Sequence, residues 1–93
     1  MWIIYEHHRV DRQYHAIPLE VRKRYEKWKD IVTISGPHGL RNIKDLRDEA
    51  LPGQWKGCRS SRPGLKYRVI YQVRKQQLLV QVIGLTSHDY RRK

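Results

Sequence analysis

The chain has 93 residues, with 20 Lys and Arg against nine Asp and Glu, so its formal net charge is +11. This length predicts a single domain over residues 1–93, and no apolar run reaches the roughly 18 residues that a membrane helix needs. One cysteine excludes an internal disulfide and the first residues lack a secretion signal, so we expect a cytoplasmic protein without membrane contact. The positive charge favours a polyanion, first nucleic acid and then an acidic protein, as the partner.

The N-terminal half has helical periodicity after one short strand. Residues 2–5 are apolar and aromatic and predict that strand. Apolar residues then recur every three or four positions and form one stripe: Val10, Tyr14, Ile17, Val21, Tyr25, Trp28 and Val32. Because proline is tolerated in the first turn of a helix but not in its interior, Pro18 divides the stripe into helices over about 8–16 and 18–33. The run Gly-Pro-His-Gly at residues 36–39 ends the second helix.

The C-terminal half predicts antiparallel strands. Residues 66–74 alternate, with Ile70 as the apolar exception on a polar side that carries Lys66, Arg68, Gln72 and Arg74. A short hairpin leads to residues 78–85, which are almost continuously apolar and predict an inner strand. Residues 55–61 predict a further strand, joined through the turn at 62–64. Residues 40–51 fit a half-exposed loop, a helical turn or an edge strand.

This order of elements predicts an α+β fold, in which a short N-terminal strand and a two-helix hairpin accompany a small antiparallel sheet. The helices pack on one face of the sheet. The opposite face, with Arg68 and with Arg59 or Lys56, is predicted to be open and basic. We expect the function to reside there.

The sequence holds no metal or cofactor motif, so we predict that neither is needed. The five histidines have no partner cysteines and no HExxH spacing, and no Gly-rich phosphate loop is present. Cys58 has basic neighbours, but nothing places a histidine beside it, so a small buried hydrophobe is the better interpretation than a nucleophile.

The remaining polar residues suit the metal-free cleavage of RNA. Attack by the 2′-hydroxyl needs a proton acceptor, a cation for the crowded phosphorane and a proton donor for the departing oxygen. Arg68 suits the phosphorane, His88 a proton transfer near neutral pH, and Tyr90 a hydrogen bond or a stacked base. Predicted contacts to the RNA backbone are Lys56, Arg62, Lys66, Arg91 and Arg92. The alternative for each of these residues is a plain surface or tail position.

Three runs carry a resemblance to a known family: Leu51-Pro52-Gly53, Cys58-Arg59-Ser60-Ser61-Arg62 and Tyr67-Arg68-Val69-Ile70-Tyr71. Their sequence and spacing resemble the RelE/ParE superfamily of bacterial toxins, most of all its RelE, YoeB and HigB branches. The resemblance implies a microbial-ribonuclease-like fold and the toxin of a type II toxin–antitoxin pair. Many such toxins cut messenger RNA in the A site of the small ribosomal subunit and leave a 2′,3′-cyclic phosphate.

The resemblance also implies roles by position. Arg68 matches the strand arginine that acts on the scissile phosphate, His88 a C-terminal general acid, and Tyr90 the nearby tail tyrosine. Arg59 falls where some members carry a catalytic lysine, which makes it the fourth expected catalytic residue. Gln54 stands where YoeB-like members have a glutamate base, and glutamine cannot accept a proton in that way, so the base stays unassigned.

The expected partners are therefore messenger RNA on the ribosome and a cognate antitoxin that is acidic at least in the segment that wraps this chain. Two alternatives remain open. One is a ParE-like poison of DNA gyrase, a branch without the nuclease residues; the other is a non-catalytic module that binds nucleic acid or an antitoxin. The joint presence of Arg68, His88 and Tyr90 favours the nuclease.

Overall fold

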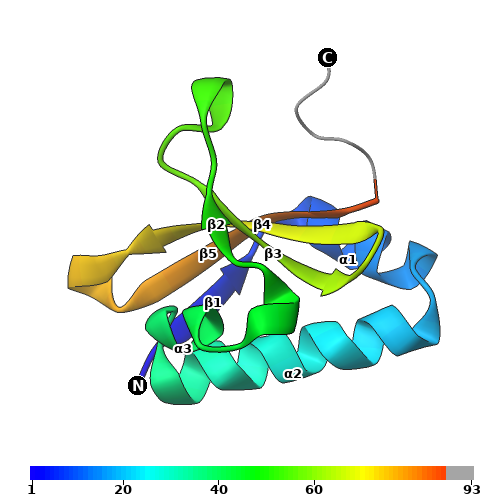
Figure 1. The fold of residues 1–93 in the computed structure, drawn as a ribbon, viewed down its shortest axis with the longest axis horizontal. Helices are drawn as coiled ribbons and strands as arrows, with labels where there is room; N and C mark the ends of the chain where they lie inside the picture. The colour runs from blue at the N-terminus through cyan, green and yellow to red at the C-terminus, as the bar shows by residue number, and fades with distance from the viewer. Residues whose placement is uncertain (88–93) are drawn as a thin grey trace.

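A five-stranded sheet with a long helix beneath it organises the chain (Figure 1), and the computed structural model describes residues 1–87. The strands are β1 (Ile3–Glu6), β2 (Glu49–Ala50), β3 (Arg59–Gly64), β4 (Tyr67–Arg74) and β5 (Leu79–Thr86). The helices are α1 (His8–Ala16), α2 (Leu19–Ser35) and α3 (His38–Arg41), with short 3-10 turns at Lys44–Leu46, Gly53–Trp55 and Lys75–Gln77. Within residues 1–87, no helix has the length and apolarity that crossing a bilayer requires.

The predicted α+β class is confirmed, with one difference in strand direction. The strand order is β1-β5-β4-β3-β2, and every pair is antiparallel except β1 with β5. The N-terminal strand thus lies parallel to the C-terminal one at the sheet's edge. Periodicity within a strand specifies which side chains share a face, but it does not specify the neighbour or its direction. The inner position predicted for residues 78–85 is confirmed, since β5 lies between β1 and β4.

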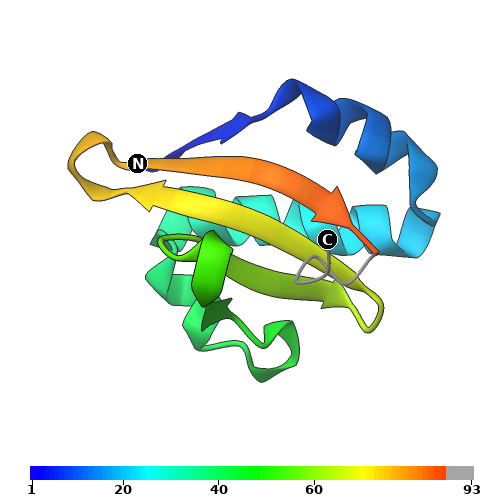
Figure 2. The ribbon, with the colours of Figure 1, turned by 90° about the horizontal axis from the view of Figure 1, so that it is seen from above.

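Of the predicted helical hairpin, α2 covers one face of the sheet, whereas α1 lies beside the edge of β5 (Figures 1 and 2), where Gln13 Oε1 accepts a hydrogen bond of 2.8 Å from the Leu85 backbone N–H. The apolar stripe of the hairpin forms the main core with Val69, Tyr71, Val80, Val82 and Leu85 of the strands. Pro18 caps α2, and Gly36 ends it with a φ of 76°, a conformation that glycine adopts without the cost of a Cβ. We call the sheet face away from these helices the outer face.

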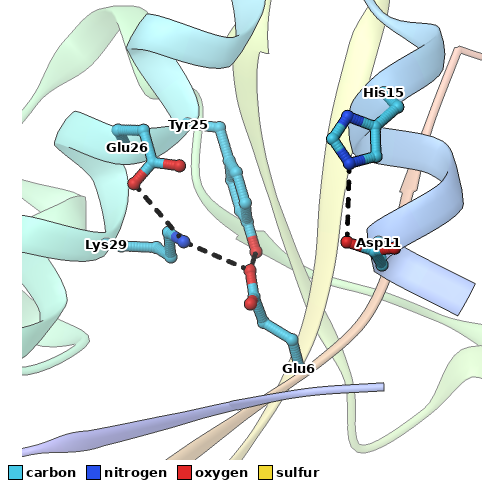
Figure 3. Close-up of polar contacts among 6 residues, drawn as sticks. All are labelled: Glu6, Asp11, His15, Tyr25, Glu26 and Lys29. Carbon is cyan, nitrogen blue, oxygen red and sulfur yellow. Dashed lines mark hydrogen bonds and ion pairs between the residues drawn. The ribbon is translucent and has the colours of Figure 1, made fainter. Parts of the chain in front are cut away.

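A polar cluster joins β1 to α2 (Figure 3). The Tyr25 hydroxyl donates a hydrogen bond of 2.5 Å to Glu6 Oε2, and Lys29 Nζ lies 3.3 Å from the same oxygen. Lys29 also lies 3.4 Å from Glu26 Oε1. The ion pairs are partly exposed and contribute little alone, but the buried tyrosine fixes the edge strand over the helix.

The central segment contains all three structures that its sequence left open. Residues 40–51 include the end of α3, a 3-10 turn and the two-residue edge strand β2. The strand predicted at residues 55–61 starts later, at Arg59, because Gly53–Trp55 forms a 3-10 turn first. The register of β3 against β4 decides which face each β3 side chain occupies.

Candidate functional site

Arg68 lies on the outer face. Val69 and Tyr71 pack into the helix-side core, so alternation along β4 directs Arg68, Ile70 and Gln72 the other way. Arg68 is half-buried and its Nε atom is shielded from solvent. A guanidinium held in this way keeps its charge and loses less conformational freedom when it binds a phosphate.

The pairing of β4 with β5 places Arg68 directly opposite Thr86. Thr86 is the last residue of β5, so Arg68 lies opposite the end of this strand. Four predicted site residues, His88, Tyr90, Arg91 and Arg92, lie outside the described residues. Their roles stay predictions.

The outer face is not uniformly basic and open, which corrects the expectation from sequence. The connection between β2 and β3 rises over this face (Figure 1), and a second apolar cluster forms beneath it. The cluster consists of Leu51, Trp55, Cys58, Ile70 and Ile83. Ile70, the exception in the β4 pattern, is therefore a core residue of this smaller cluster. Alternation in β4 alone gave no sign that a distant loop would cover it.

Cys58 is a buried member of this cluster, which confirms its prediction as a small hydrophobe. Burial raises the pKa of its thiol, so the nucleophilic thiolate is disfavoured.

Arg59 lies on the helix side rather than beside Arg68. It is directly opposite Tyr71 in the pairing of β3 with β4. The Tyr71 ring packs edge-on against Trp28 of α2, with 5.3 Å between the two ring centroids. Cross-strand partners share a face, so Arg59 and Arg68 are on opposite faces of the sheet. The expectation that Arg59 belongs to the outer face is wrong, because the register of β3 against β4 pairs Arg59 with a residue of the helix-side core.

A fully buried carboxylate, Asp48, explains the position of Arg59. Asp48 Oδ1 accepts from Arg59 Nε at 2.8 Å and from Nη2 at 2.7 Å, while Oδ2 accepts from Ser61 Oγ at 2.6 Å. The Tyr71 hydroxyl donates to the same Oδ2. Partial burial lowers the pKa of Arg59, but the hydrogen bond and charge of Asp48 outweigh this effect and leave it above its usual value. Asp48 thus joins the start of β2 to β3 and β4.

Sequence reasoning missed Asp48. It stands in a segment rich in charges, where an aspartate is typical of an exposed loop, and its three partners come from two later strands. Only the pairing of β3 with β4 brings Arg59, Ser61 and Tyr71 around one carboxylate.

The other predicted RNA contacts are dispersed. The 3-10 turn Gly53–Trp55 rises over the outer face. Gln54 within this turn and Lys56 directly after it are both exposed. Lys66 is exposed in the turn between β3 and β4. Arg62 instead lines a groove of about 490 Å³ on the helix side, together with Arg24 and Trp28. Among residues 1–87, no three His, Cys, Asp or Glu side chains gather as a metal site.

Two buried tyrosines predict that the protein loses stability in alkali. Burial, followed by hydrogen bonds to Glu6 and Asp48, raises the pKa of Tyr25 and of Tyr71 above the usual 10. Above pH 10 the unfolded chain loses these protons and the folded chain retains them, so the free energy of unfolding falls as pH rises. The expected slope is about 1.4 kcal/mol per pH unit for each tyrosine.

Urea unfolding between pH 8 and 11.5 measures this slope. Tyr71→Phe is expected to be less stable than the wild type at every pH. Above pH 10, however, its free energy of unfolding is expected to fall less steeply, by about 1.4 kcal/mol per pH unit, because one of the two tyrosines is absent. Equal slopes for Tyr71→Phe and the wild type would show that Tyr71 does not cause the loss of stability in alkali.

The chain thus combines a parallel edge strand, a helical hairpin and an antiparallel meander, an arrangement that can be compared with known folds. No protein-family model and no curated protein sequence matches the chain. Solved structures do match over nearly its whole length. The archaeal RelE of the RelE–RelB complex from Pyrococcus horikoshii is 21% identical with a TM-score of 0.75, covering 96% of this chain and 97% of that one.

Two further toxins match in the same way. YoeB of the YoeB–YefM complex from Staphylococcus aureus is 14% identical with a TM-score of 0.71, covering 95% of this chain and 98% of that one. The isolated RelE toxin of E. coli is 20% identical with a TM-score of 0.68, covering 96% and 86%. The resemblance to RelE/ParE toxins is therefore confirmed for the fold.

Proposed function

We propose that this chain is the toxin of a type II toxin–antitoxin pair and that it cuts messenger RNA on the ribosome. The observation that carries the proposal is the position of Arg68 within a RelE-like fold. Arg68 is held half-buried on the outer face, opposite the residue after which the tail with His88 and Tyr90 begins. His88 follows Thr86 by two positions in the sequence.

The reaction follows from these groups. The ribose 2′-oxygen attacks the adjacent phosphorus, the bond to the 5′-oxygen of the next nucleotide breaks, and a 2′,3′-cyclic phosphate remains. Arg68 stabilises the extra negative charge of the phosphorane through paired N–H donors. His88 gives a proton to the departing 5′-oxygen, and Tyr90 hydrogen-bonds or stacks beside it. The group that removes the 2′-proton is unassigned.

The basic residues divide by location. Lys56 and Lys66 are proposed to contact the RNA backbone around Arg68, and Arg91 and Arg92 to extend this contact from the tail. Arg62 is proposed to add to the general attraction of the positive surface, since it lies on the helix side. Arg59 is proposed to act through the strand geometry that it fixes with Asp48 rather than by touching RNA.

The antitoxin is the second proposed partner. Several toxins of this fold were solved as complexes with antitoxins, such as RelE with RelB and YoeB with YefM. The net charge of +11 favours an acidic wrapping segment.

Induced expression in a bacterial host tests the proposal. We expect growth arrest within one generation, together with new RNA 5′ ends inside translated codons that are absent without induction. RNA ends mapped in parallel for His88→Ala are expected to lack these sites. Intact transcripts with trapped DNA breaks would instead identify a gyrase poison, and arrest without either lesion would refute the nuclease.

A further inference from the structure

A row of three side chains crosses the outer face away from Arg68. Tyr5 of β1 is directly opposite Gln81 of β5, and Gln81 is directly opposite Gln72 of β4. Directly opposed residues in neighbouring strands share a face and lie about 5 Å apart. The three side chains therefore form a line perpendicular to the strands, on the same face as Arg68 (Figure 2 views this face).

Tyr5 is unusual among the tyrosines of the described chain. Tyr5 is 59% exposed, whereas Tyr25 and Tyr71 are fully buried and Tyr14 and Tyr67 are half-buried. Gln81 is its direct neighbour on the outer face and Gln72 follows one strand further, while Ile3, two residues earlier in β1 on the same face, is itself 63% exposed. An exposed aromatic ring next to hydrogen-bonding amides is a chemical match for a nucleobase, which has an apolar π-face and a polar edge.

The amides are partly ordered before any ligand arrives. Gln72 and Gln81 are both half-buried. Arg74 Nη2 donates to Gln72 Oε1 at 3.3 Å, which directs the Gln72 amide group and leaves its NH₂ available as a donor. Gln81 offers both a donor and an acceptor next to the Tyr5 ring. An amide with both functions can make paired hydrogen bonds with a base edge.

We propose that Tyr5, Gln81 and Gln72 form a binding site for one unstacked base of single-stranded RNA. The base stacks on Tyr5, and the two amides contact its edge. The identification of RNA as the ligand rests on the proposed function. Gln72 is four residues from Arg68 along β4, about 13 Å by strand rise, so the bound base belongs to a nucleotide that flanks the cleaved bond. The site thus selects the sequence next to the cut.

Binding of short 2′-O-methyl RNA tests the site without cleavage, because the methyl group blocks the attacking oxygen. Labelled hexamers of A and of U are titrated by fluorescence anisotropy at several salt concentrations. Tyr5→Ala is expected to weaken binding of the preferred hexamer about 5- to 150-fold. Tyr5→Phe is expected to retain most of the affinity. The salt dependence is expected to be the same in both variants, since no phosphate contact is removed.

Matched controls separate stacking from a general surface effect. Leu19 on α2 is 61% exposed, close to the value for Tyr5, and Leu19→Ala is expected to leave binding unchanged. Gln81→Ala is expected to change the ratio of A- to U-hexamer affinities, because it removes edge contacts and keeps the ring.

Several results overturn the site. They are an affinity of Tyr5→Ala within twofold of the wild type, an equal loss with a hexamer of abasic nucleotides, or no hexamer binding by the wild type. A Tyr5-dependent affinity in a chain that causes no RNA cleavage would uphold the site and reject the nuclease, so the two proposals fail separately.

Discussion

Arg68→Ala is expected to abolish growth arrest and to lower the rate of RNA cleavage by about 10²- to 10³-fold, the usual cost of one preorganised charge stabiliser. The guanidinium is proposed to contact the phosphorane more strongly than the substrate phosphate, so the loss falls on the chemical step. Single-turnover cleavage of messenger RNA on purified ribosomes, at saturating toxin, measures this step. Arg68→Lys keeps the charge but loses the two-pronged donor, and an intermediate rate is expected.

A matched variant controls for charge. Arg24 is exposed on α2, on the helix side, and Arg24→Ala removes the same positive charge from the surface away from the outer face. Its cleavage rate at saturating toxin is expected to equal that of the wild type, because weaker long-range attraction slows encounter and not the chemical step. Folded Arg68→Ala protein that cuts RNA at the wild-type rate would exclude the outer face as the site. Thermal unfolding of each variant establishes that it is folded.

Much of the fold follows from the sequence because its elements are strongly periodic. The stripe from Val10 to Val32 predicts both helices, and Pro18 and Gly36 limit them nearly where the structure does. Polar and apolar alternation likewise predicts the two sides of β4. These signals lie within single helices and strands, so they can be interpreted without knowing which elements pack beside them.

The site was less predictable, because its arrangement depends on contacts between distant segments. The position of Arg68 follows from alternation within one strand. The side occupied by Arg59 depends on the register of β3 against β4, which the sequence of β3 alone does not specify. The buried charge of Asp48 depends on three partners from other strands. A row such as Tyr5, Gln81 and Gln72 requires the parallel pairing of β1 with β5, which no local pattern indicates.

Asp48→Ala is expected to lower the free energy of unfolding by about 3–5 kcal/mol, the cost of leaving a buried ionic partner uncompensated. The substitution removes the acceptor of Arg59, of the Ser61 hydroxyl and of the Tyr71 hydroxyl at once. In a chain of this size the midpoint of thermal unfolding should fall by at least about 12 °C. Asp45→Ala, an exposed acid three residues away, is expected to change stability by no more than about 0.5 kcal/mol.

A double-mutant cycle then separates the structural role of Arg59 from a chemical one. Asp48→Ala combined with Arg59→Ala is expected to be less destabilised than the sum of the single variants, because neither partner is left behind alone. Arg59→Ala assayed well below its unfolding midpoint is expected to cut RNA within about tenfold of the wild type, less than the loss of one direct charge contact. A loss as large as that of Arg68→Ala, with the protein still folded, would instead make Arg59 a catalytic residue. In that case the β3 edge would have to turn Arg59 away from Asp48 when RNA binds.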